Sequence, residues 1–168
     1  MTKFLPRFRV ILFSLVPGAL FAQDLIGHDA KIPIYEKDAA TFYVPARVNE
    51  QTDSEFMVDT GSGYTAINEA MFAEIRHVEH TEYVETISAV LADGSEIAMP
   101  IYRIASLNIG GNCIIRNVEV AILPGQTRNI LGLSALKMVA PFSLFMDPPA
   151  LGLSNCGSNM VSKAEKSL

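Results

Sequence analysis

The stretch Phe56-Met57-Val58-Asp59-Thr60-Gly61-Ser62-Gly63-Tyr64-Thr65-Ala66-Ile67 decides how this chain folds. An apolar run ends in a single carboxylate, Asp59, and a second apolar run follows a turn that contains Gly61 and Gly63. These glycines permit a tight turn because they accept backbone angles that are closed to other residues. Aspartate is depleted in strands, and a carboxylate delivered by an apolar strand tends to be buried and to need hydrogen-bond donors. The arrangement therefore indicates a functional site rather than a purely stabilising turn.

A second element downstream strengthens this interpretation, because the tripeptide Asp-Thr-Gly alone is also compatible with an ordinary turn. Residues 129–136 read Asn-Ile-Leu-Gly-Leu-Ser-Ala-Leu, which is an apolar pair, a glycine and a short helical run. They lie about seventy positions after Asp59, the separation at which a small barrel of short strands returns to its own centre. The two segments are therefore expected to form one pattern.

In this order and spacing, the two motifs resemble the retroviral-type (retropepsin-like) aspartic proteases. The resemblance is strongest to the bacterial single-domain branch with an N-terminal export segment, and it extends over residues 41–153. It implies an all-β fold, a small closed barrel of the acid protease type with one or two short helices. It also implies a polypeptide substrate, no cofactor, and a homodimer in which each chain supplies one catalytic Asp59.

The resemblance implies supporting roles for the three residues after Asp59. Thr60 would hydrogen-bond to the same loop of the partner chain, and Gly61 would let the backbone approach both the carboxylate and the substrate. Ser62 would donate a hydrogen bond to the outer oxygen of Asp59 and favour its ionised form, which would shift the working range towards acidic pH.

Two further groups of residues receive roles from the resemblance. In the second motif, Ile130 and Leu131 would line the substrate cleft, and Gly132 would pack closely against the Asp59 loop. The hairpin after the first helix would be a flap over the substrate, and its tip would consist of Ala92, Asp93 and Gly94. An ordinary surface hairpin is the alternative for this segment.

The sequence departs from the retroviral pattern at two positions. Retroviral members usually carry an acidic residue two places after the glycine of the first motif and an arginine directly after the glycine of the second motif. Gly63 and Leu133 occupy these positions here. Because both partners of this ion pair are absent together, no charge is left unpaired, and a different dimer brace is expected.

Length and composition limit the possible classes of protein. The chain has 168 residues, of which 49% are hydrophobic and 18% charged, and this favours one globular domain over disorder. The formal net charge of −5 excludes an ordinary nucleic-acid partner. We expect a signal segment at residues 1–22, a leader with a possible edge strand at 23–40, the protease domain at 41–154 and a flexible tail at 155–168.

The N-terminus is expected to direct export. Residues 1–22 contain a basic start, the apolar run 10–15, a helix-breaking Pro17-Gly18 pair and the small-residue end Ala-Leu-Phe-Ala. This order is typical of a secretory signal peptide cut after Ala22, and it predicts a periplasmic or secreted protein. The alternative is an uncleaved segment that anchors the protein to a membrane, although its apolar run is short for a membrane span.

The two cysteines are candidates for a disulfide cross-link, and two of the histidines are candidates for metal ligands. In an exported protein, Cys113 and Cys156 predict either one disulfide bond or two free thiols, and the sequence leaves both open. His77 and His80 have a spacing suited to a metal on a helix. No carboxylate or cysteine cluster joins them, so no metal site is expected and a solvated helix end is preferred.

Short β-strands dominate the expected secondary structure, with two helices. Asn68 is expected to cap the first helix, and an Asp-Gly pair marks the turn at residues 92–95. Pro45 suggests a strand edge or bulge, and Pro100 suggests an interruption. The expected strands are 31–35, 42–48, 55–58, 64–67, 83–91, 96–109, 113–123, 142–146 and 150–153, and the expected helices are 69–76 and 133–138.

Two functional hypotheses of different class follow. The first is an aspartic endopeptidase in which water is activated between two Asp59 carboxylates of a homodimer. The second is a non-catalytic binding or chaperone-like domain on the same β scaffold, which the altered brace at Gly63 and Leu133 would favour. A serine or cysteine hydrolase is not supported, because no histidine lies in a plausible triad context.

Overall fold

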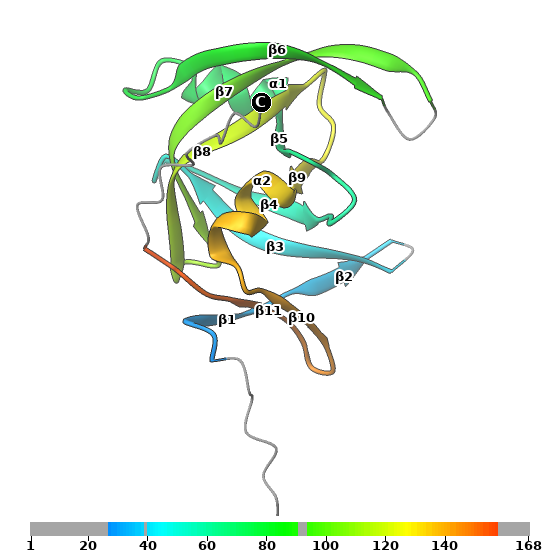
Figure 1. The fold of residues 1–168 in the computed structure, drawn as a ribbon, viewed down its shortest axis with the longest axis vertical. Helices are drawn as coiled ribbons and strands as arrows, with labels where there is room; N and C mark the ends of the chain where they lie inside the picture. Colours follow the sequence, from blue (N-terminus) through cyan, green and yellow to red (C-terminus); the bar gives the residue numbers. More distant parts are fainter. Residues whose placement is uncertain (1–26, 39, 91–93, 158–168) are drawn as a thin grey trace, which may run out of the picture.

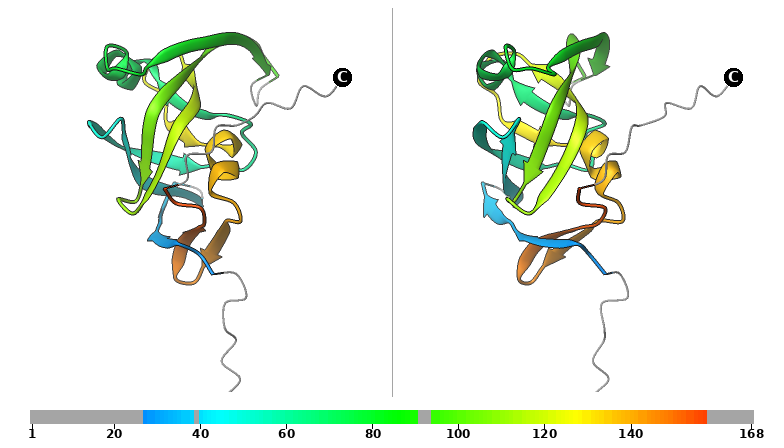
Figure 2. Two further views of the ribbon diagram at one scale, coloured as in Figure 1. Left: turned by 60° about the vertical axis from the view of Figure 1, so that its left-hand side comes forward. Right: turned by 90° about the vertical axis from the view of Figure 1, so that its left-hand side faces the viewer.

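The computed structural model describes residues 27–38, 40–90 and 94–157, and these residues form two sheets and two short α-helices (Figures 1 and 2). The predicted signal segment 1–22 and most of the predicted tail lie outside the described residues. The elements are β1 (Ala30–Pro33), β2 (Tyr35–Lys37), β3 (Thr41–Val48), β4 (Thr52–Val58), β5 (Thr65–Asn68), α1 (Glu69–Ile75), β6 (Glu82–Val90), β7 (Glu96–Ile109), β8 (Cys113–Leu123), β9 (Asn129–Leu131), α2 (Leu133–Leu136), a 3₁₀ turn (Lys137–Val139), β10 (Ser143–Met146) and β11 (Pro149–Leu153).

The larger sheet confirms the predicted all-β class with short helices, but its barrel is not strictly closed. Its strand order is β2-β3-β4-β9-β5-β8-β7-β6, and a further pairing of β3 with β7 turns the sheet back on itself. The contact between β5 and β9 is one residue pair, Ala66 with Ile130, and β2 and β6 lie outside the ring. The long strand β7 explains this shape, because its first half pairs with β6 and its last three residues pair with β3.

The centre of the sheet brings the two sequence motifs together. Strand β9 lies between β4 and β5 and runs parallel to β4, with Val58 opposite Leu131. Strand β5 runs parallel to β8. Parallel neighbours cannot be joined by a tight turn and need a long connection. The first motif at the end of β4 and the second motif in β9, about seventy positions apart, therefore lie on adjacent strands.

The prolines in the strands lie where the ladder of hydrogen bonds tolerates them. Pro45 is in β3, between the residues that pair with β2 and those that pair with β7, and its carbonyl oxygen accepts a 2.8 Å hydrogen bond from the Gly110 N–H. Proline has no backbone N–H to donate, and Pro45 lies where β3 changes its neighbour from β2 to β7. The interruption expected near Pro100 is absent. Strand β7 continues through Pro100, and its pairing with β8 begins at the next residue, Ile101.

The helix α1 begins where the sequence predicts. The side chain of Asn68 accepts a 2.8 Å hydrogen bond from the Met71 N–H and so caps the first turn. Met71 and Ile75 are buried in the main core, and Phe72 packs against it. That core consists of the inward-facing residues of the strands, such as Phe56 in β4 and Leu131 in β9, both fully buried. Among the described residues, no helix is long and apolar enough to cross a membrane.

A second, three-stranded sheet, β1-β11-β10, lies at the end of the molecule opposite the β6–β7 hairpin (Figure 2). The predicted leader supplies its edge strand, β1.

Cys113 at the start of β8 forms a disulfide bond with Cys156, so of the two alternatives that the sequence left open, the structure has the bridge. The Gly157 N–H also donates a 2.8 Å hydrogen bond to the Ile114 carbonyl oxygen, so the predicted tail is attached to the fold at its start.

Candidate active site

Asp59 lies directly after β4, where the strand enters the loop. Its backbone N–H donates a 3.1 Å hydrogen bond to the Leu131 carbonyl oxygen, which extends the β4–β9 ladder by one residue. The strand pairing therefore determines where the carboxylate leaves the sheet. The residue is half-buried, and the following Thr60 and Gly61 are exposed.

The carboxylate of Asp59 is held by the loop backbone. Its Oδ1 accepts a 2.8 Å hydrogen bond from the Gly61 N–H. A Cβ at position 61 would lie 3.2 Å from the same oxygen, so glycine suits this close approach. None of the salt bridges between described residues includes Asp59. The group is therefore oriented without being neutralised by a cation.

The predicted bond from Ser62 to Asp59 is wrong for the single chain. The Ser62 hydroxyl instead donates a 2.7 Å hydrogen bond to the Tyr64 carbonyl oxygen. The reason is local, because the turn brings that carbonyl within reach and leaves the backbone N–H of Gly61 for the carboxylate. The bond predicted for Thr60 would reach a second chain and stays a prediction.

Gly132 packs against the Asp59 loop as closely as the second motif predicts. A Cβ at this position would lie 2.1 Å from the Tyr64 carbonyl oxygen and 3.0 Å from the Ser62 carbonyl oxygen. The next residue, Leu133, donates a 2.9 Å hydrogen bond to the same Ser62 oxygen. Only a residue without a side chain allows α2 to begin here. The first residue of α2 then holds the loop through the hydrogen bond to Ser62.

A pair of hydroxyl groups that sequence reasoning missed completes this support. The buried Thr65 Oγ1 accepts a 3.1 Å hydrogen bond from the Gly132 N–H, and the Thr65 N–H donates a 2.8 Å bond to Ser134 Oγ. The Ser134 hydroxyl in turn donates to the Glu119 carbonyl oxygen at 3.0 Å. The bonds from Thr65 join residues 67 and 69 positions apart, so no local pattern in the sequence signals them.

A pocket of about 220 Å³ adjoins the loop. The loop supplies Gly61, Ser62, Gly63 and Tyr64, and the other lining residues, apart from Ile130, come from β5, β6, β7 and β8. These others are mostly apolar: Ala66, Ile87, Ala89, Val90, Met99, Ala121 and Leu123. The β6–β7 hairpin therefore forms one wall of a hollow that adjoins the loop after Asp59.

The second motif and the hairpin tip contribute unequally to this pocket. Ile130 lines it, whereas Leu131 is fully buried in the core, so the prediction that both line the cleft is wrong for Leu131. Successive residues of β9 point to opposite faces of the sheet, which explains the difference. At the predicted tip, Ala92 and Asp93 lie outside the described residues, and Gly94 is exposed with a φ of +83°.

Burial and two carboxylates, those of Glu85 and Glu119, act on the pKa of Tyr64 in the pocket wall. Glu119 also forms a 3.0 Å salt bridge with Arg103. Burial raises the pKa of Tyr64, and the carboxylates of Glu85 and Glu119 raise it further. The phenol is therefore neutral at physiological pH. His77 and His80 are both exposed, and in the described part of the chain no group of three or more His, Cys, Asp or Glu side chains could hold a metal ion.

The comparisons with known proteins agree with this geometry. A family model described as "gag-polyprotein putative aspartyl protease" matches residues 44–138, a range that includes both motifs. The fold is similar to that in "Crystal structure of a retropepsin-like aspartic protease from Rickettsia conorii", with a TM-score of 0.57 and 22% identity over 74% of this chain and 91% of that chain. A search of curated proteins found no match.

Proposed function

The chain belongs to the family of retropepsin-like aspartyl proteases, and from this premise we propose that it is an endopeptidase that cleaves polypeptides as a homodimer. The observation that carries the proposal is the environment of Asp59. Its carboxylate accepts the Gly61 N–H at 2.8 Å and is in no salt bridge between described residues, and the loop residues that follow it line a largely apolar pocket. A carboxylate that served only stability would be expected to have a cationic partner or to lie in open solvent.

The proposed reaction needs two copies of Asp59 across a two-fold axis. Two carboxylates about 3 Å apart cannot both ionise at low cost, so they share one proton, as in other aspartic proteases. The ionised member takes a proton from a water molecule held between them, and that water attacks the peptide carbonyl carbon. The protonated member hydrogen-bonds the carbonyl oxygen and later protonates the leaving amine. The pair titrates as a unit.

The loop geometry supports a role at a dimer interface. Thr60, Gly61 and Gly63 are exposed in the single chain, although α2 and the Thr65 hydroxyl hold the loop firmly on its inner side. Surface that is rigidly supported and left uncovered is suited to contact with a second molecule. A second loop of the same kind, brought across the axis, would supply the second carboxylate.

The competing function is a non-catalytic binding domain on the same scaffold. It is favoured by Gly63 and Leu133, which replace the charged pair that braces retroviral dimers. The backbone of Leu133 instead donates to the Ser62 carbonyl oxygen within the same chain, at 2.9 Å. A mature protein that stays monomeric at every accessible concentration would support this second function.

The decisive experiment combines Asp59→Asn with a measurement of oligomeric state. The wild-type protein should cleave an unfolded protein or peptide library with an activity per subunit that rises with protein concentration, because only the dimer is active. Asp59→Asn should remove cleavage while the circular dichroism spectrum and sedimentation behaviour stay the same. Cleavage that survives the substitution would exclude the proposed mechanism.

We further propose that the protein works outside the cytoplasm, in the periplasm or as a secreted protein. The signal-like segment supports this, and so does the bond between Cys113 and Cys156, because disulfides persist in oxidising compartments. An uncleaved N-terminal segment that anchors the protein to a membrane is the alternative. The mass of the protein recovered from its native host distinguishes them, since cleavage after Ala22 leaves Gln23 as the first residue.

A further inference from the structure

A second hollow, of about 420 Å³, is lined by residues of β2, β3 and β4, by Asn68 at the end of β5, and by residues 127–129 at the start of β9. Unlike the pocket beside the loop, it is polar. Its charged lining consists of Lys37, Glu55 and Arg128, and Tyr43 forms one of its walls. The Tyr43 ring stacks on Tyr35 with centroids 6.3 Å apart, which makes this wall rigid.

Among the described residues, the charges of this hollow leave one cation without a carboxylate partner. The Lys37 ammonium forms a salt bridge with Glu55, and this hydrogen bond lowers the pKa of the Glu55 carboxyl. Arg128 is in none of the salt bridges between described residues. Its guanidinium Nη1 donates a 3.5 Å hydrogen bond to the Met57 sulfur. The hollow therefore carries a net charge of one positive unit, located at Arg128.

Arg128 also lies close to Asp59 along the sheet. Met57, which it contacts, is two residues before Asp59 on β4, a distance of about 7 Å along a strand. Met57 is opposite Ile130 in the β4–β9 register, and Ile130 lines the apolar pocket. Met57 and Ile130 thus connect the polar hollow to the pocket beside the catalytic loop.

We propose that Arg128 is a specificity-determining residue that selects polypeptides with an Asp or Glu side chain near the bond to be cleaved. The inference rests on the proposed endopeptidase function and names its substrate class. Side chains of an extended peptide on the same side repeat about every 7 Å, so one placed in the polar hollow would belong to a residue within about three positions of the scissile bond.

The chemistry of the guanidinium suits this role. An arginine binds a carboxylate through two parallel N–H donors, and such charge-assisted bonds are stronger than neutral ones. Glu55 does not compete for Arg128, because Lys37 already holds it. In a two-fold dimer the same selection would apply on both sides of the cleaved bond, so substrates with acidic residues on either side would be preferred.

The test compares matched peptides that carry either Glu or Gln at one position within three residues of the cleaved bond. For the wild-type enzyme, kcat/KM should be about two- to fivefold higher for the Glu peptide at one or more positions. In Arg128→Gln this ratio should fall to about one, and in Arg128→Glu a Lys peptide should be preferred instead. Arg116→Gln is the matched control, because Arg116 is an exposed arginine of β8 that lines neither hollow.

A binding measurement separates this inference from the proposed function. Asp59→Asn leaves the polar hollow intact, so it should bind the Glu peptide about two- to fivefold more tightly than the Gln peptide, and added Arg128→Gln should remove the difference. If the wild-type protein cleaves nothing but this binding preference is present, the protease function fails, and the recognition of acidic side chains by Arg128 stands. Equal affinities, equal kcat/KM values, or a preference that survives Arg128→Gln would overturn the inference.

Discussion

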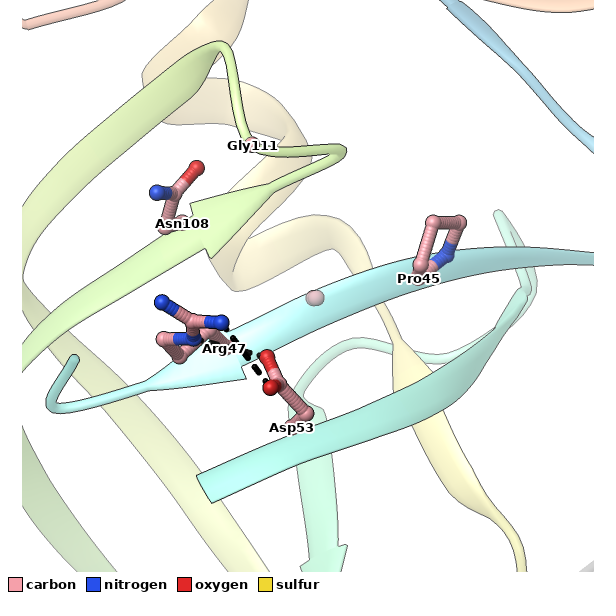
Figure 3. A pocket seen from close by; sticks show the side chains of 6 residues that line it. Pro45, Arg47, Asp53, Asn108 and Gly111 are labelled. Atoms are coloured by element: carbon pink, nitrogen blue, oxygen red, sulfur yellow. Dashed lines mark hydrogen bonds and ion pairs between the residues drawn. The ribbon is translucent and has the colours of Figure 1, made fainter. Parts of the chain in front are cut away.

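Strand β4 has one aspartate near each end, and the two have opposite environments. Near the start of the strand, Asp53 accepts two hydrogen bonds from the Arg47 guanidinium, at 2.7 and 2.9 Å, beside a small pocket that also includes Asn108 and Gly111 (Figure 3). After the end of the strand, the carboxylate of Asp59 accepts, among the hydrogen bonds between described residues, the Gly61 N–H and no cation. A carboxylate that is permanently paired with a cation has little left to offer a substrate, whereas one oriented by a single amide keeps lone pairs available.

The two ends also differ in how they are held. The Asp53 end is close to the disulfide, because β3 pairs with the end of β7, and Ile109 there pairs with Cys113. The Asp59 end has no covalent cross-link among the described residues and depends on hydrogen bonds to β9 and α2. One end is therefore built for stability, and the other keeps a reactive group accessible.

The largest expected effect is the contrast between Asp59→Asn and Asp53→Asn. The first should lower kcat/KM for peptide cleavage by about 10³-fold or more, because it removes the group that activates water. The second should leave kcat/KM within about twofold, because a paired surface carboxylate contributes little. The measurement is a peptide assay on both variants, with circular dichroism as the control for folding. A similar loss in both would remove the distinction between the two ends.

Removing the disulfide should affect stability at the Asp53 end. The bridge closes a loop of 43 residues, and the chain-entropy model assigns it about 4 kcal/mol at most. The Cys113→Ser and Cys156→Ser double variant should therefore lose up to about 4 kcal/mol in free energy of unfolding, measured with urea. Its peptide-cleaving activity per folded molecule should be retained at temperatures where it stays folded. A loss of catalysis without unfolding would contradict the separation between the Asp53 end, which the disulfide stabilises, and the Asp59 end.

Gly132→Ala should disturb the Asp59 end. The new Cβ would lie 2.1 Å from the Tyr64 carbonyl oxygen, so backbone must move, and we expect a loss of about 1–3 kcal/mol in unfolding free energy. Gly63→Ala is the matched control for stability. A Cβ there has no atom within 4 Å, and its unfolding free energy should change by no more than about 0.5 kcal/mol. Equal stability of both variants would mean that the contact with α2 does not hold the loop.

The Arg47–Asp53 pair should give the smallest effect, and its pH dependence has a definite sign. The Arg47 guanidinium lowers the pKa of Asp53 below its ordinary value of 3.8, so the pair stabilises the folded state above that pH and loses its contribution as pH falls through the lowered pKa. Urea unfolding of wild type and Asp53→Asn should therefore differ slightly at neutral pH and converge well below pH 3.8. A difference that grew in acid would contradict this assignment.

Much of the fold could be predicted from local patterns. The strands 96–109 and 113–123 are β7 and β8 with the expected bounds, and Asn68 caps α1, because alternation and capping depend on neighbouring residues. The interruption predicted near Pro100 is wrong, because the effect of a proline on a strand depends on which edge of the strand is paired with a neighbour. That pairing is a property of the sheet and is not visible in one strand.

The contacts of the candidate site were only partly predictable from the sequence. The two motifs led to the turn at Gly61 and to the close approach of Gly132 to the Asp59 loop, and the structure has both. The hydroxyl of Ser62 was assigned to the wrong acceptor, and Thr65 was not recognised as the residue that links the loop to Gly132. These hydrogen bonds depend on the placement of segments that are far apart in the chain.

The sequence by itself determined the family, the β class and the acidic turn that carries Asp59, because glycine spacing and apolar runs express what such a tight turn requires. The tertiary structure decided which residues face the pocket and which carboxylate stays unpaired. It directs Ile130 towards the pocket and Leu131 into the core, pairs Asp53 with Arg47 and, among the described residues, gives Arg128 a sulfur acceptor and no carboxylate. The reason is physical, because strand register and face are set by pairing between distant segments.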